Sequence, residues 1–87
     1  EAEFQLLNIT VFPNPASDLL VIQLNDLITE EFQVDLYDLS GKRVSQSTIK
    51  AGSTIAYFDT QAVYPGTYVL AISSGKFKTT RKVVITK

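Results

Sequence analysis

Short runs of β-branched and aromatic residues recur along this chain, and turn-forming residues close each run. Strands of this length at regular spacing are typical of an all-β domain, and no run shows the longer period of a helix. With 87 residues, the chain can build only one core. We therefore expect a small immunoglobulin-like antiparallel β-sandwich of about seven strands, with a small barrel as the alternative.

The expected strands differ in how their apolar residues alternate. The run at residues 32–37 alternates cleanly, which predicts one buried face carrying Phe32, Val34 and Leu36. The run at residues 19–24 is apolar on both sides, which predicts a central or doubly covered strand. The other expected strands are Ile9–Phe12, Arg43–Ile49, Thr54–Phe58, a strand carrying Tyr68, Leu70 and Ile72, and a last strand carrying Phe77, Val83 and Ile85.

Proline and glycine mark two of the turns. Pro13-Asn14-Pro15 must end the first strand, because proline lacks a backbone donor and forces its predecessor into an extended conformation. Tyr64-Pro65-Gly66 predicts a type II turn with Gly66 at its third position, where φ is positive. Tyr68 follows as either a core residue or the centre of a tyrosine corner, which is a hydroxyl bonded to nearby backbone.

Another turn is predicted at residues 38–42. Gly41 can adopt positive φ, and the carboxylate of Asp38 can accept hydrogen bonds from nearby backbone amides. This turn makes a hairpin between the third and fourth expected strands. Ala51-Gly52-Ser53 is the next turn signal along the chain.

The last strand combines an ambiguous pattern with a basic charge. Thr79 and Arg81 share the inward parity of Val83, so either a bulge resets the register or the strand leaves the core midway. The basic residues at this end of the chain are expected on an exposed strand, as a solvated and protected edge or as a docking surface. They are Lys76, Lys78, Arg81, Lys82 and Lys87.

Composition argues against catalysis and against several classes of partner. The chain contains no cysteine and no histidine, which leaves no thiol nucleophile and no imidazole base or metal ligand. A net charge of −1 offers no footprint for nucleic acid, and no apolar run is long enough to span a bilayer. We expect no enzyme, no cofactor and no metal site.

Two weaker alternatives use residues on turns and outward faces. Asp18, Asp38 or Asp59 offer oxygen ligands for calcium, although turn capping is the simpler role for each of them. Exposed rings at Tyr37, Tyr57 or Tyr64 would suit a carbohydrate-binding or adhesive module of a secreted surface enzyme.

Three stretches taken in order carry a resemblance to a known family. They are Val11–Asp18 with its Pro-Asn-Pro, Leu36–Val44 with its Asp-Leu-Ser-Gly-Lys, and Pro65–Ile72 with its Pro-Gly-Thr-Tyr. Together they resemble the C-terminal sorting domain of the type IX (Por) secretion system, over about residues 11–87. The family's terminal strand carries spaced lysines, a pattern that Lys82 and Lys87 fill.

The resemblance implies a non-catalytic sorting signal that directs its cargo through the periplasm and across the outer membrane of a Gram-negative bacterium. It implies outer-membrane secretion-machinery proteins and a sortase-like peptidase as partners, with the cargo then secreted or held at the cell surface. Self-association through edge strands is a further expectation. The residues carried over as recognition positions are Pro13, Asn14, Pro15, Asp38, Gly41, Lys42, Val44, Gly66, Tyr68, Lys82 and Lys87.

Further expectations concern the two ends of the chain. The first four residues look like the remnant of a secretion leader and a cloning-site dipeptide, so residues 5–87 are the expected domain. Lys87 is expected to stand at the natural end of the protein. Because exposed charges add little stability, replacing Lys82 and Lys87 is expected to impair export and leave the fold largely intact. Scaffold roles remain the alternative for the glycines and prolines of the motifs.

Overall fold

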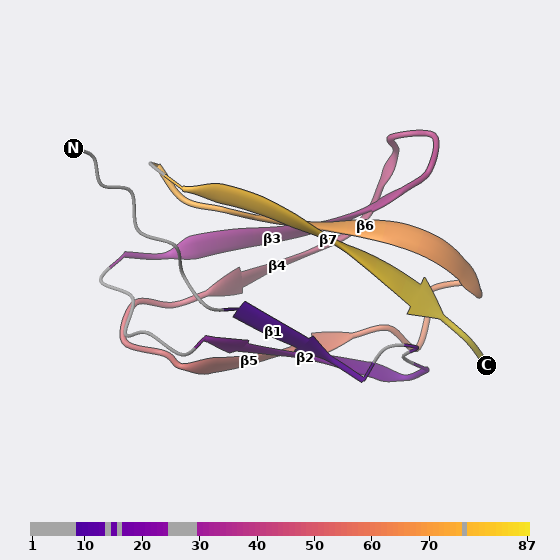
Figure 1. The fold of residues 1–87 in the computed structure, drawn as a ribbon, viewed down its shortest axis with the longest axis horizontal. Coiled ribbons are helices and arrows are strands. Elements are labelled where there is room, and N and C mark those ends of the chain that lie inside the picture. The colour runs from indigo at the N-terminus through magenta and orange to yellow at the C-terminus, as the bar shows by residue number, and fades with distance from the viewer. Residues whose placement is uncertain (1–8, 14, 16, 25–29, 76) are drawn as a thin grey trace.

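A computed structural model gives the fold and describes residues 9–13, 15, 17–24, 30–75 and 77–87. These residues form two packed antiparallel sheets (Figure 1). The strands are β1 (Ile9–Phe12), β2 (Leu19–Leu24), β3 (Phe32–Asp38), β4 (Arg43–Ile49), β5 (Ile55–Asp59), β6 (Gly66–Ser73) and β7 (Lys78–Ile85). Within the described ranges, no helix is long and apolar enough to cross a membrane.

The strand order confirms the predicted sandwich. One sheet has the order β1-β2-β5 and the other β4-β3-β6-β7. In constant-type immunoglobulin domains the fourth strand lies with the first, second and fifth. Here β4 pairs with β3 instead, because a tight turn at residues 39–42 joins them as a hairpin. The Asn25–Glu31 connection falls largely outside the described residues.

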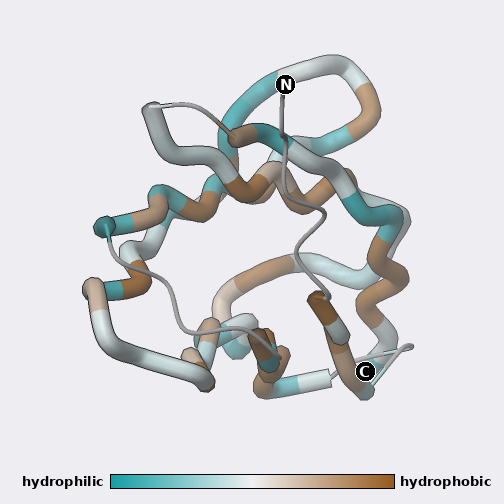
Figure 2. Tube along the Cα trace, turned by 60° about the vertical axis from the view of Figure 1, so that its left-hand side comes forward, coloured by the Kyte–Doolittle hydropathy of each residue, from teal (hydrophilic) through white to brown (hydrophobic). Residues whose placement is uncertain are grey.

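The core lies between the two sheets and is built by the inward parity of each strand. Hydrophobic and hydrophilic positions alternate along the strands (Figure 2). Phe32, Val34 and Leu36 are buried, as the alternation predicted. The largest fully buried apolar side chains are those of Phe58, Leu20, Ile22, Leu36, Ile49, Leu70, Ile72, Ile85, Val34 and Val83.

The central position of β2 explains why its sequence is apolar on both sides. Val21 lies on the outward face, yet it is only 9% exposed. Its cross-strand partners are Phe12 of β1 and Tyr57 of β5, which flank it on that face. The sequence-based expectation of a central strand is therefore confirmed.

The last strand leaves the core midway. The ladder between β6 and β7 runs without a register shift from the Gly66–Ile85 pair to the Ser73–Lys78 pair. Val83 and Ile85 are buried, whereas Thr79 and Arg81 are only partly covered, and the Arg81 guanidinium donates to the Thr79 hydroxyl over 2.7 Å. Of the two readings left open by the sequence, the one without a bulge is correct, and β7 forms an edge of its sheet.

Candidate recognition surface

The turns singled out from the sequence gather at one end of the sandwich. Because neighbouring strands are antiparallel, the connections after β1, β3 and β5 lie at the same end as the chain terminus that follows β7 (Figure 1). We call this end the motif end. Its described residues are Pro13, Pro15, Ser17, Asp18, residues 39–42, residues 60–65, Thr86 and Lys87.

The β3–β4 turn is organised by Asp38. Its carboxylate accepts hydrogen bonds from the Ser40 hydroxyl at 2.6 Å and from the backbone amides of Ser40 and Lys42 at 2.9 and 3.0 Å. Gly41 has φ of 92°, as expected for this turn. These bonds, the one from the Ser40 hydroxyl foremost, lower the pKa of Asp38 below its ordinary value. The turn is therefore rigid with the carboxylate charged, and the predicted capping role is confirmed.

Tyr68 combines the two roles that the sequence left open. Its ring is 8% exposed and belongs to the core cluster, while its hydroxyl donates to the backbone carbonyl of Tyr64 over 2.6 Å. This is the hydrogen bond of a tyrosine corner. It fixes the 60–65 connection against the start of β6.

Gly66 corrects the predicted turn type. It has φ of 157° and is already the first residue of β6, paired with Ile85, so it does not occupy the third position of a type II turn. A Cβ at this position would lie 3.6 Å from the ring of Tyr68. The close ring and the start of the strand, rather than a left-handed turn, set the surroundings of this glycine.

Lys87 is not presented to solvent as an exposed charge. Its ammonium donates to the backbone carbonyls of Ser17, Thr60 and Gln61 over 3.0, 2.9 and 3.2 Å. The Asp18 carboxylate lies 3.7 Å away, and the lysine side chain is 29% exposed. The premise that Lys87 is a free surface charge is therefore wrong, because its ammonium is bonded to three carbonyls of the chain.

Thr60 is a structural residue that the sequence did not point to. It is fully buried, its hydroxyl donates to the Ser17 carbonyl over 2.8 Å, and its amide donates to the Asp18 carbonyl over 3.0 Å. These bonds join the turn before β2 to the turn after β5. Asp59 beside it caps the amide of Gln61 at 2.9 Å, which is the turn-capping role predicted for that aspartate.

The other carried-over residues lie apart from this network. Lys42 is exposed on the β3–β4 turn, and Val44 sits at the register shift that follows it, 40% exposed. Lys82 is exposed further along β7 and pairs with Val69. Asn14 and Lys76 are outside the described residues. The structure thus brings Lys87 to the turn before β2 and to the connection after β5. The β3–β4 turn lies at the same end but stands apart from them, at the top of Figure 1.

Exposed apolar side chains concentrate at and beside the motif end. Tyr64 is 84% exposed and Leu39 is 72% exposed, both on its turns. Phe12, Leu19 and Val44, which border those turns, are each exposed by about two fifths of their surface. Exposed apolar groups that cluster are a mark of protein contact. Ile55 and Tyr57 on β5 are the remaining large apolar side chains described as exposed.

The tyrosines do not form one flat platform. Tyr37 is partly covered on the outer face of the four-stranded sheet, and Tyr57 lies on the outer face of the other sheet. Tyr64 lies on a turn at the motif end. Rings on opposite faces of the sandwich cannot stack on one sugar chain, so these three positions do not combine as a carbohydrate site.

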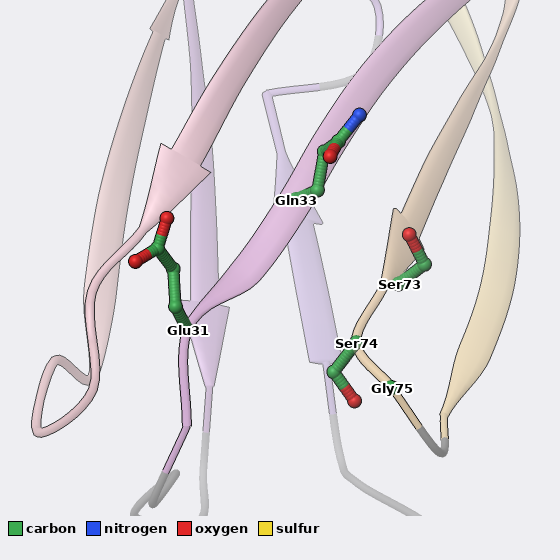
Figure 3. Close-up of a pocket in the computed structure, with 5 residues that line it drawn as sticks. All are labelled: Glu31, Gln33, Ser73, Ser74 and Gly75. Carbon is green, nitrogen blue, oxygen red and sulfur yellow. The ribbon is translucent and has the colours of Figure 1, made fainter.

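A polar depression of about 310 Å³ lies at the opposite end of the sandwich. Figure 3 shows its lining residues, in which the side chains of Glu31 and Ser74 point away from each other. They form no pair of base and nucleophile. The remaining lining residues are Gln33, Ser73 and Gly75. Among the described residues, the lining of this depression presents no exposed apolar side chains of the kind found at the motif end.

Comparison with protein families identifies a match for this chain. Residues 10–86 match the family model described as the secretion system C-terminal sorting domain. The matched segment contains all seven strands except the first residue of β1. A search of curated proteins found no match.

Proposed function

This chain belongs to the family of type IX secretion system C-terminal sorting domains, and from that membership we propose that its folded sandwich acts as a non-catalytic export signal. The family match covers residues 10–86, which supports a signal formed by the folded domain rather than by a short tail. The domain would direct a linked cargo protein across the outer membrane. In this proposal it works by being bound, without chemistry of its own.

The motif end is the surface that we propose the secretion machinery binds. Its turns are held by Asp38 and Tyr68, which makes their shape rigid before any partner arrives. Exposed Leu39 and Tyr64 supply the apolar and aromatic contacts that dominate protein interfaces. A rigid surface with exposed anchors binds at a small entropic cost.

The steps that follow binding extend the proposal. The domain would reach the machinery from the periplasm, and a sortase-like peptidase at the cell surface would then remove it. The cargo would be released or attached to a surface lipopolysaccharide.

The observation that carries this proposal is the family match over residues 10–86. Fusing the 87-residue chain to the C-terminus of a periplasmic passenger should bring that passenger to the surface or medium of a bacterium with a type IX system. The passenger alone, and the fusion in a strain without the secretion pore, serve as controls. Retention of the fusion in the periplasm of the competent strain would contradict the proposal.

A further inference from the structure

The ammonium of Lys87 occupies a cage of oxygen atoms. Three backbone carbonyls, of Ser17, Thr60 and Gln61, accept hydrogen bonds from it at 3.0, 2.9 and 3.2 Å. A lysine ammonium has three protons, so the three carbonyls match its full donor capacity. The Asp18 carboxylate at 3.7 Å adds a negative charge on the same side. This is a built site for a primary ammonium.

Most of the cage is held in place without help from Lys87. Thr60 donates through its amide to the Asp18 carbonyl at 3.0 Å and through its hydroxyl to the Ser17 carbonyl at 2.8 Å. The Val63 amide donates to the Thr60 carbonyl at 3.0 Å. These bonds join the turn before β2 to the start of the connection that leads from β5 to β6. Two of the three acceptor carbonyls, those of Ser17 and Thr60, are therefore oriented without the lysine.

Lys87 brings the other sheet to this cage. It follows β7, the edge strand of the four-stranded sheet, whereas the cage residues lie just before β2 and just after β5, which are strands of the three-stranded sheet. In Figure 1 the chain leaves β7 at the right and descends toward the level of the three-stranded sheet. The contact with Ser17 joins residues 70 positions apart in the sequence. Lys87 thus closes the sandwich at the motif end, across its two layers.

We propose that Lys87 is a positioning residue that acts as a clasp and assembles the recognition surface. Seating the ammonium in the cage fixes the end of β7 beside Ser17 and Asp18 and beside the connection at residues 60–63. A partner then meets the three segments as one surface only when residue 87 is a seated lysine. This inference rests on the proposed export function. In it, Lys87 acts through contacts within the domain, and the secretion machinery does not recognise its charge directly.

Substitutions of Lys87 separate the clasp from simple charge. Lys87→Arg keeps the positive charge, but a planar guanidinium does not present three protons to three converging carbonyls. Lys87→Met keeps much of the apolar stem and removes the charge. Loss of charge-assisted bonds should shift the chain end about tenfold toward the unseated form in both variants. Lys78→Ala, an exposed lysine at the other end of the same strand, is the matched control.

Nuclear magnetic resonance of the 87-residue chain tests seating directly. The peptide groups of the three carbonyls include the amide nitrogens of Asp18, Gln61 and Ala62, so these three signals should shift in Lys87→Arg, Lys87→Met and Lys87→Ala. They should stay in place in Lys78→Ala. Adding propylammonium chloride to Lys87→Ala should return the signals toward their original positions, because the free ammonium can occupy the cage, whereas sodium chloride at equal ionic strength should not.

Export of the fused passenger tests the consequence. Both Lys87→Arg and Lys87→Met should reduce export, and Lys78→Ala should not. Normal export with Lys87→Arg but not with Lys87→Met would mean that charge is read, and would overturn the clasp. Unchanged amide signals, or unchanged export in both variants, would also overturn it. Failure of the unsubstituted fusion to be exported would instead contradict the proposed function, and the spectra would still report whether the lysine is seated.

Discussion

Leu70→Ala is expected to lower the free energy of unfolding by about 3 kcal/mol and to reduce export of a fused passenger. Leu70 is fully buried at the centre of the core, between the two sheets, and no partner can touch it. Removing its side chain leaves a cavity among packed neighbours. Small domains have only about 5–15 kcal/mol of stability, so this loss leaves a folded majority but raises the unfolded population by roughly a hundredfold.

This result distinguishes a folded signal from a linear one. Urea unfolding followed by circular dichroism gives the stability of the variant, and surface display of the passenger gives its export. Thr48→Ala, an exposed position on β4, should change the unfolding free energy by no more than about 0.5 kcal/mol and leave export intact. Full export of a destabilised Leu70→Ala fusion would mean that the machinery reads an extended segment.

The double substitution Leu39→Ala with Tyr64→Ala should reduce export by about 30-fold or more while leaving the fold in place. Both side chains are exposed on turns of the motif end, so their removal opens no cavity. The backbone carbonyl of Tyr64, which accepts the Tyr68 hydroxyl, is retained in the variant. Exposed aromatic and aliphatic anchors that become central to an interface are worth about 2 kcal/mol or more each.

The chain provides a matched control for this pair. Ile55 and Tyr57 on β5 are also one aliphatic and one tyrosine side chain, 42% and 61% exposed. Ile55→Ala with Tyr57→Ala removes similar exposed apolar surface away from the motif end. The Ile55→Ala, Tyr57→Ala pair should leave export unaffected. The Leu39→Ala, Tyr64→Ala pair should unfold at nearly the same urea concentration as the unsubstituted chain. Equal loss of export in the two pairs would remove the case for a localised surface.

The architecture was predictable where physical causes are local. The alternation in β3 identified its inward face, and the apolar residues on both sides of β2 indicated a central strand. The chemistry of Asp38 and Gly41 identified the β3–β4 turn. Sheet membership of the fourth strand was not predictable in the same way. It depends on whether β4 stays paired with its hairpin partner or crosses to the other sheet. The seven residues of β4 contain no pattern that distinguishes these two arrangements.

The features that the sequence did not predict depend on contacts between distant residues. Lys87 donates to carbonyls 70 and 27 positions earlier in the chain, so the residues around it in the sequence do not predict this role. Thr60 resembled any polar residue after a strand, although its burial makes it a link between two turns. Gly66 lay in a strong turn pattern, but pairing with Ile85 placed it in β6. In each case tertiary packing decided the conformation or role.

Site-specific photo-crosslinking tests the central claim most directly. A benzophenone amino acid would replace Tyr64 in one fusion and Tyr57 in another, since both are exposed tyrosines but only the first lies at the motif end. Irradiation of the exporting bacterium should link position 64, and not position 57, to an outer-membrane component of the secretion machinery identified by mass spectrometry. Crosslinking from position 57 with none from position 64 would contradict recognition through the motif end.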